Sequence, residues 1–307
     1  MIVSESMLRD MMRLLIWYPI RWLLYALPLR SGINLINFLG TIDICTFSGK
    51  KKMIMRKVTE VFPEKDETWT SEVVKTYIRN HYMNQLQIML FPKMRLSNID
   101  KIHSFEGLDR LDDALKKGRG CILIHPHFGP TQLPLHILGI KGYNMTQLGY
   151  LTDDGLSYIG KNVAFKLRTK LESKIKARIV QADSFLRPLF QCLKSNGVLM
   201  MTGDGAGGKK FIGRYKPFSF CNSTYLFPIG AATLAAKTGA PMMPVFITME
   251  GNRYKTNIEP PIYVKNDDED IYKATFHFVK TFESYLKKNP GFWHFWDELE
   301  HRRVNEQ

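Results

Sequence analysis

Two histidines stand where a predicted strand gives way to a predicted helix. His125 and His127 directly follow the apolar run 121–124, which is typical of a buried parallel strand. Gly129 and a proline then open a predicted helix. The N-terminus of a helix offers free N–H groups and a partial positive field. This order of elements favours His127 as a general base beside a site that stabilises an oxyanion.

Two other interpretations of the histidine loop stay open. One is a structural role, in which a histidine ties the loop together. The other is a metal site, for which His125 and His127 would need a third ligand from elsewhere. The cysteines show neither C-x-x-C pairing nor metal-ligand spacing, and we expect buried free thiols in a reducing compartment at Cys45, Cys121, Cys192 and Cys221.

A glycine-rich loop follows a second apolar run, at 197–202. Its sequence, 203–208, fits the G-x-G-x-x-G pattern of dinucleotide sites. Such a site needs a helix next and an acidic residue about 20 positions further on. Here a basic stretch follows, and the next acidic residue after Asp204 is Glu250. We therefore reject the dinucleotide site and predict a flexible active-site loop that carries Asp204.

A basic strand is predicted directly after this loop. Its cationic side chains could bind phosphate groups, and they are Lys209, Lys210, Arg214 and Lys216. A solvated basic hairpin is the alternative interpretation.

Strands and helices are predicted to alternate, which indicates an α/β fold with a mostly parallel central sheet flanked by helices. The loops after the carboxyl ends of such strands usually carry the chemistry, here 125–130 and 203–210. Strands are predicted at 121–124, 145–150, 177–180, 197–202 and 241–249, with 253–264 as a hairpin partner. Helices are predicted at 31–60, 67–91, 107–117, 131–140, 156–175, 183–195, 227–238 and 268–288.

The N-terminal part of the chain forms a separate predicted unit. Residues 13–29 are apolar and aromatic, but Pro19 and Arg21 interrupt them. They fall short of the ~20 clean apolar residues of a spanning helix, and no signal-peptide cleavage site follows. We predict a membrane-associated helical segment, 1–45, lying at a membrane surface, and then an α/β domain, 46–307. An ordinary buried helix packed on the domain is the alternative.

The chain is strongly basic, with 43 Lys and Arg against 29 Asp and Glu in 307 residues and a formal charge of +14. Such a field attracts polyanions, which can be nucleic acid, an anionic membrane surface, or acidic carriers and substrates. No nucleic-acid-binding motif is present, and the apolar N-terminal segment argues against that partner. The G-x-S-x-G pattern is absent, which disfavours a serine hydrolase.

Four stretches together resemble a known family. The sequence His127-Phe-Gly129 resembles the His-Phe-Gly-Asn-Trp-Glu box of bacterial lipid A lauroyl/myristoyl acyltransferases and of related phosphatidylinositol mannoside acyltransferases. These families belong to a superfamily that carries His-x-x-x-x-Asp/Glu. The other three stretches are 196–205, 227–245 and 293–303, and the resemblance covers roughly residues 10–303.

The histidine box departs from the family at one chemically important position. Gln132 stands five residues after His127, where the family has Glu or Asp. A glutamine can accept a hydrogen bond from an imidazole N–H, but it cannot supply the charge that stabilises an imidazolium. Asp204 is the best candidate to supply that charge; otherwise the site is weakened or repurposed. Pro130 and Thr131 replace the family's Asn and Trp, so we expect a different acceptor pocket.

The resemblance implies a fold like that of glycerol-3-phosphate acyltransferases and an acyl-thioester-dependent O-acyltransferase activity. His127 would be the general base, oriented by Asp204 with help from Gln132, and N–H groups near Gly129 would hold the oxyanion. The residues expected to contact substrates are His125, Gly129, Lys209, Lys210, Arg214 and Arg303.

The implied partners are an acyl donor and a lipid. The donor would be acyl carrier protein or acyl-coenzyme A, and the acceptor a membrane lipid or glycolipid. We expect the protein at an anionic membrane surface, on the cytoplasmic face of the bacterial inner membrane. No metal, redox cofactor or nucleic acid is expected. The alternative is a catalytically weakened lipid-binding relative at the same surface.

Overall fold

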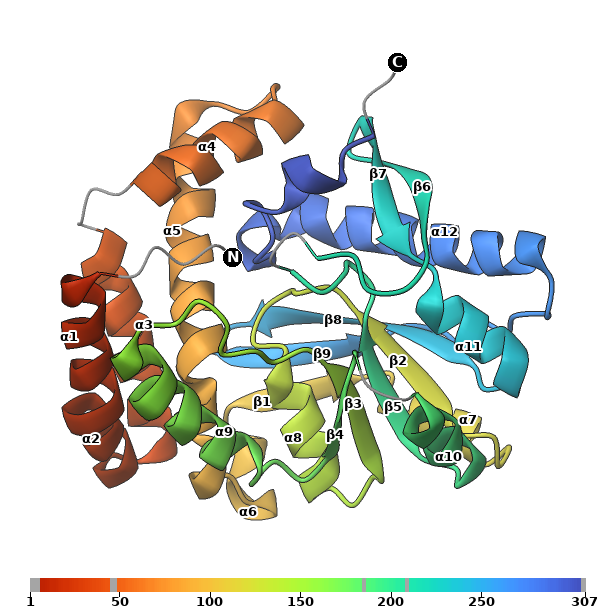
Figure 1. Cartoon of the computed structure of the whole chain (residues 1–307), viewed down its shortest axis with the longest axis horizontal. Coiled ribbons are helices and arrows are strands. Elements are labelled where there is room, and N and C mark those ends of the chain that lie inside the picture. The colour runs from red at the N-terminus through yellow and green to blue at the C-terminus, as the bar shows by residue number, and fades with distance from the viewer. Residues whose placement is uncertain (1–5, 45–48, 184–185, 208–209, 305–307) are drawn as a thin grey trace.

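A seven-stranded sheet organises the molecule (Figure 1). The computed structural model describes residues 6–44, 49–183, 186–207 and 210–304. The strand order is β1-β9-β8-β2-β5-β3-β4. The strands are β1 (His103–Glu106), β2 (Cys121–His125), β3 (Met145–Gly149), β4 (Arg178–Gln181), β5 (Val198–Thr202), β8 (Met242–Glu250) and β9 (Arg253–Ile258).

Five neighbouring strands of this sheet, from β8 to β4, are mutually parallel. The last two reverse direction, because β9 pairs antiparallel with β8 and parallel with β1. All five residues of β2 are buried, which explains why its sequence is an unbroken apolar run. The predicted α/β class with a mostly parallel sheet flanked by helices is confirmed.

Helices cover this sheet and extend beyond one side of it, where Figure 1 shows α1 to α5 gathered together. The α-helices are α1 (Met7–Leu15), α2 (Arg21–Ala26), α3 (Leu29–Ile44), α4 (Gly49–Val61), α5 (Glu67–Leu86), α6 (Leu96–Ile99), α7 (Leu108–Leu115), α8 (Gln132–Ile140), α9 (Lys166–Glu172), α10 (Arg187–Lys194), α11 (Gly230–Thr238) and α12 (Asp268–Lys288). Two π-helical turns, η1 (Ile16–Ile20) and η4 (Gly160–Phe165), lead into α2 and α9. Short 3₁₀ turns are η2 (Gln87–Met89), η3 (Phe91–Lys93), η5 (Pro290–Phe292) and η6 (Leu299–Arg302).

Several predicted elements have different bounds in the structure. The helix predicted at 67–91 ends at Leu86 and continues as 3₁₀ turns. The helix predicted at 227–238 begins only at Gly230. Residues 227 and 228 belong instead to a separate two-stranded hairpin, β6 (Tyr215–Phe220) with β7 (Ser223–Pro228). For this stretch we predicted a basic strand, with a basic hairpin as the alternative. Strand β1 was not predicted.

The N-terminal segment has an inner and an outer side. Trp17, Leu24 and Ile36 are buried in the core. In contrast, Met7 is 82% exposed and Trp22 is 62% exposed, so large apolar side chains also face outward. Within the described parts of the chain, no helix is both long enough and apolar enough to cross a membrane.

The described cysteines agree with the prediction of buried free thiols, since Cys121, Cys192 and Cys221 are all buried and reduced. Cys45 lies outside the described residues.

Candidate active site

The parallel register of β2 and β5 brings the two predicted catalytic residues together. His125 lies opposite Thr202 at the ends of these strands. The pairing continues one step further, where the N–H of Gly203 donates to the carbonyl of His125 at 2.8 Å. His127 lies two residues after His125, and Asp204 lies two residues after Thr202. Both therefore project from the same carboxyl edge of the sheet.

His127 and Asp204 form a tight hydrogen-bonded pair. His127 Nδ1 lies 2.7 Å from Asp204 Oδ1, and the main-chain N–H of His127 donates to Oδ2 at 2.8 Å. The indole N–H of Trp293 donates to the same Oδ2 at 3.0 Å. The structure thus places Asp204 in contact with His127, while the predicted orienting role of Asp204 stays a prediction. With the proton on Nδ1 facing the carboxylate, Nε2 keeps a lone pair for a substrate.

Asp204 is 1% exposed, yet its surroundings favour the ionised form. Burial raises the pKa of this carboxyl, but the charge and hydrogen bond of His127, the nearby guanidinium of Arg302 and the Trp293 N–H together hold the pKa below its usual value. The carboxylate is thus a fixed negative charge that stabilises an imidazolium at His127.

An aromatic and cationic layer covers this pair. The ring of Phe295 stacks on the imidazole of His127 with 3.8 Å between centroids. The buried guanidinium of Arg302 lies over the Phe295 ring, 5.4 Å from its centroid. Gly205 has a φ of +96°, and a Cβ at this position would collide with that guanidinium. The glycine-rich loop therefore needs a glycine here for Arg302 to approach Asp204.

Several backbone groups of the histidine loop have partners inside the protein. Its N–H donates to the carbonyl of Phe292 at 2.8 Å, and its carbonyl lies 2.8 Å from His294 Nε2. The N–H of Thr131 donates to Asn84 Oδ1 at 3.1 Å. The N–H groups of Gly129 and Thr131 therefore already have partners inside the protein, and the expectation that N–H groups near Gly129 hold an oxyanion stays a prediction.

His125 is buried beside the pair and is not positioned as a second base. Its Nδ1 lies 2.9 Å from the carbonyl of Pro126, and its Nε2 is buried without a hydrogen-bond partner. Burial lowers the pKa of His125 to about 4, so its imidazole is neutral. Among the residues that the structure describes, no group of three or more His, Cys, Asp or Glu side chains could hold a metal ion.

Gln132 lies beside a buried acid. Its amide N–H donates to Glu172 Oε1 at 3.4 Å, while its own Oε1 is buried without a partner. Glu172 is itself buried and forms an ion pair with Arg168 at 2.9 Å. Position 132 therefore has no carboxylate of its own but lies beside one. Neither Arg168 nor Glu172 was among the predicted site residues.

A polar cavity of about 190 Å³ lies in front of the pair. His127 lines this cavity. The other lining residues come from α5, α8 and α9, from the strands β2, β3, β4 and β5, and from the loops that follow β2, β3 and β5. The polar members of this lining are Asn84, His125, His127, Thr131, Gln132, Gln147, Tyr150, Arg168, Glu172 and Thr202.

The basic residues that were predicted to contact substrates lie in different places relative to this cavity. The ammonium group of Lys210 contacts the hydroxyl of Tyr150 and lies over its ring, 4.6 Å from the centroid, at the edge of the cavity. Arg214 is exposed, and only its carbonyl has a described contact, with Ile229 N–H. Arg303 is exposed, and its main chain forms an isolated antiparallel β-bridge with Tyr225 of the hairpin. Its neighbour Arg302 instead approaches Asp204. Lys209 lies outside the described residues.

Comparison with known proteins assigns this fold and site to a family. No curated protein matches the chain. The profile of the family described as bacterial lipid A biosynthesis acyltransferase matches residues 6–299, which is nearly the whole chain. The match includes the histidine loop, the glycine-rich loop and the segment that covers them. The chain therefore belongs to the bacterial lipid A biosynthesis acyltransferase family, whose members transfer an acyl group to a lipid.

Proposed function

We propose that this protein moves a fatty acyl chain from an acyl thioester to a hydroxyl of a membrane lipid or glycolipid, with His127 as the general base. The observation that carries the proposal is the 2.7 Å contact between His127 Nδ1 and Asp204 Oδ1. It leaves Nε2 of a correctly oriented imidazole facing a polar cavity. Family membership supports the acyl transfer itself.

The proposed reaction needs one proton shuttle. Nε2 of His127 takes the proton of the acceptor hydroxyl as its oxygen attacks the thioester carbonyl. The tetrahedral intermediate then collapses, the C–S bond breaks, and the imidazolium returns the proton to the sulfur. The products are an ester and a free thiol, and Asp204 stabilises the imidazolium between the two steps.

The negative charge of the intermediate needs a donor outside the histidine loop. The N–H groups of His127, Gly129 and Thr131 already donate within the protein, so we place the oxyanion partner on a side chain of the cavity. Arg168 lines the cavity; its Nε donates to Glu172 at 2.9 Å and its Nη1 to Gln85 at 3.1 Å, and its remaining N–H groups would face the substrate in this proposal. Its guanidinium is the oxyanion partner in this proposal.

The N-terminal helices form the membrane-docking face in this proposal, on the cytoplasmic side of the bacterial inner membrane. Outward-facing apolar side chains on α1 to α3 are the ones that would enter the acyl boundary. They are Met7, Leu8, Met11, Met12, Leu15, Tyr18, Trp22, Leu23, Phe38 and Ile42. The Trp22→Ser, Leu23→Ser double variant should sediment less with vesicles that contain anionic lipid. Phe276→Ser, an exposed aromatic of α12, is the control, and equal binding by all three proteins would contradict the docking face.

Lipid mass spectrometry tests the reaction directly. Extracts of cells that express the protein are supplied with labelled acyl–acyl carrier protein in one arm and labelled acyl-coenzyme A in the other. The wild type should add one labelled acyl chain to a lipid, and His127→Ala should lose about 10²–10⁴-fold of that rate. His277→Ala removes an exposed histidine of α12 and should leave the rate unchanged.

The two arms also identify the acyl donor, and they test the alternative of a catalytically weakened lipid-binding relative. Labelling from one arm only identifies that donor. If no lipid is labelled in either arm, the catalytic proposal fails, and the catalytically weakened lipid-binding relative becomes the better description.

A further inference from the structure

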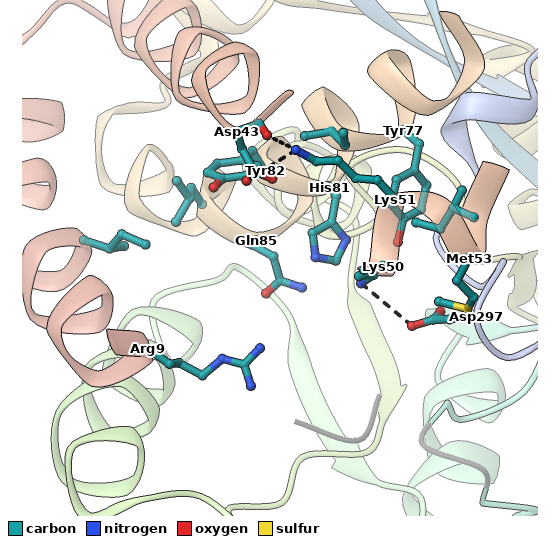
Figure 2. A pocket seen from close by; sticks show the side chains of 14 residues that line it. Arg9, Asp43, Lys50, Lys51, Met53, Tyr77, His81, Tyr82, Gln85 and Asp297 are labelled. Carbon is teal, nitrogen blue, oxygen red and sulfur yellow. Dashed lines mark hydrogen bonds and ion pairs between the residues drawn. The ribbon is translucent and has the colours of Figure 1, made fainter. Parts of the chain in front are cut away.

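A second and larger cavity lies apart from the catalytic one, between the N-terminal helices and α5. Its volume is about 570 Å³. The lining comes from α1, α3, α4, α5 and the segment just before η6. Figure 2 shows Arg9, His81, Gln85 and Lys50 around one open space, with Lys51 and Asp43 at its far side.

Positive charge predominates in this cavity. Arg9, Lys50 and Lys51 line it, together with two carboxylates. Lys51 is engaged by Asp43, whose carbonyl accepts a close hydrogen bond from its ammonium group. Lys50 lies 3.8 Å from Asp297, which is too long for a hydrogen bond. Lys50 and Asp297 thus form a long ion pair, and both side chains line the same cavity.

The cationic groups of this cavity also repel one another. Burial lowers the pKa of Lys50, and the charge of Arg9 lowers it further, although Asp297 opposes this. Burial likewise holds the pKa of His81 well below its usual value, and Lys50 adds to that effect. Like charges that face one empty space are stabilised when an anion enters it.

Two buried polar atoms in the lining have no hydrogen-bond partner among the residues that the structure describes. They are the hydroxyl of Tyr77, whose side chain is 2% exposed, and Nδ1 of His81. A buried hydroxyl without a hydrogen bond costs free energy that a ligand oxygen would recover. A cluster of an ammonium, a guanidinium, a phenol and an imidazole offers many donors, and a phosphate offers the matching acceptors.

We propose that this cavity binds a phosphate group of one of the two substrates, either the phosphopantetheine arm of the acyl donor or the head group of the acceptor lipid. The assignment of substrates rests on the proposed function. The ligand chemistry is the same in both cases, because each source presents a phosphate ester beside a chain that must reach His127.

One short segment connects the phosphate cavity to the catalytic pair. Phe295 stacks on His127, and Asp297 faces Lys50 in the cavity. Two residues of chain span at most about 7 Å, so the two sites share this segment as a wall. The His81 ring also lies 5.8 Å from the His294 ring, and His294 contacts the carbonyl of Gly129. A phosphate held here would anchor its substrate next to the reacting groups.

Calorimetric titration of the full chain in detergent tests the site without any acyl transfer. The probes are inorganic phosphate, 4′-phosphopantetheine against pantetheine, and glycerol 3-phosphate against glycerol. The phosphate-bearing member of at least one pair should bind saturably, and its dephosphorylated partner should not. Lys50→Met and Arg9→Met should each weaken that binding about tenfold or more, since each removes a charged donor.

Control variants distinguish phosphate binding in this cavity from a general effect of positive charge and from the catalytic step. Arg56→Met removes an exposed cation of the same helix α4 and should bind as the wild type does. Lys50→Arg keeps the charge and should retain most of the binding, which excludes misfolding as the cause of the loss. His127→Ala should bind phosphate normally even where it transfers no acyl chain.

The possible results have distinct meanings. A preference for 4′-phosphopantetheine assigns the cavity to the donor, and a preference for glycerol 3-phosphate assigns it to the acceptor. Saturable binding of phosphate with no acyl transfer by the wild type would support the site and contradict the proposed function. The proposal is overturned if no phosphate probe binds, or if Lys50→Met and Arg56→Met bind equally well.

Discussion

Replacing Asp204 by asparagine is the most informative single change, because the structure determines which way the new amide must face. Oδ2 accepts two hydrogen bonds, from the His127 main chain and from Trp293, whereas Oδ1 accepts only one, from His127 Nδ1. The amide oxygen of asparagine is therefore expected at the Oδ2 position. Its NH₂ group then faces Nδ1 of His127.

A donor opposite Nδ1 forces the imidazole into the other tautomer. His127 must then carry its proton on Nε2, and this nitrogen can no longer accept the proton of a substrate hydroxyl. The same change in the serine-protease triad lowers kcat about 10⁴-fold for this reason. We expect a loss of similar size, on the order of 10³–10⁴-fold in kcat. KM should change little, because the lost interaction forms only in the transition state.

The fold should survive this substitution. The three hydrogen bonds at position 204 are kept in number, so the free energy of unfolding should fall by no more than roughly 1–3 kcal/mol. The assay measures kcat and KM with a labelled acyl thioester, alongside denaturant titration of the same protein. Asp113→Asn, at an exposed aspartate paired with Lys116, is the matched control. If Asp204→Asn keeps kcat within tenfold of the wild type while His127→Ala is inactive, the reasoning from the tautomer is refuted.

Two further predictions concern buried titratable groups. Gln132→Glu places a second carboxyl beside Glu172, and the repulsion between the two raises a pKa of the pair. We therefore expect the unfolding free energy to fall by roughly 1–3 kcal/mol at pH 8. At pH 5 the loss should be smaller, because one of the two carboxyls is then more easily protonated. Denaturant titrations at both pH values measure this, and equal losses would contradict it. Burial also lowers the pKa of His103 to about 3 and those of His125, His136 and His294 to about 4. Below about pH 6.5 the unfolded chain therefore binds more protons than the folded chain does. The unfolding free energy should fall as the pH drops from about 6.5 toward 4, by up to about 1.4 kcal/mol per pH unit for each histidine. His136→Gln should flatten that slope by one proton, and an unchanged slope would show that His136 does not contribute.

The parallel part of the fold and the contact between His127 and Asp204 were predictable because both depend on local signals. The apolar runs at 121–124 and 197–202 are buried strands, and parallel strands place the residues after them at one edge. His127 and Asp204 lie at corresponding positions after these runs, so the sequence sufficed to place them together.

The β6–β7 hairpin lacks the signals that identify a hairpin in sequence. Its tight turn places Cys221 and Asn222 at φ values of 49° and 61°, a conformation that Asn-Gly or Asp-Gly usually marks. Pro217 lies inside β6, and a proline within a run argues against a strand. The hairpin is stabilised by tertiary packing instead, for instance by Phe220 against Phe282 of α12.

Long-range contacts account for what sequence reasoning missed in the site. The N–H of Gly129 seemed available because a helix begins after it, but the carbonyl of Phe292, far along the chain, accepts its hydrogen bond. Glu172 likewise reaches Gln132 across 40 residues. The spacing of Arg168 and Glu172 at i and i+4 on one helix was a visible signal of an ion pair. Nothing local indicated that this pair would be buried beside the histidine box.

The glutamine at position 132 is consistent with a complete catalytic site once the charges around it are considered. The imidazole of His127 needs one carboxylate, and Asp204 already provides it at 2.7 Å. A second carboxylate, Glu172, lies buried within 3.4 Å of Gln132 and forms an ion pair with Arg168. A glutamate at 132 would add a further negative charge beside this ion pair. The neutral amide and the Arg168–Glu172 pair are therefore compatible with each other, and the departure from the family pattern need not weaken the base.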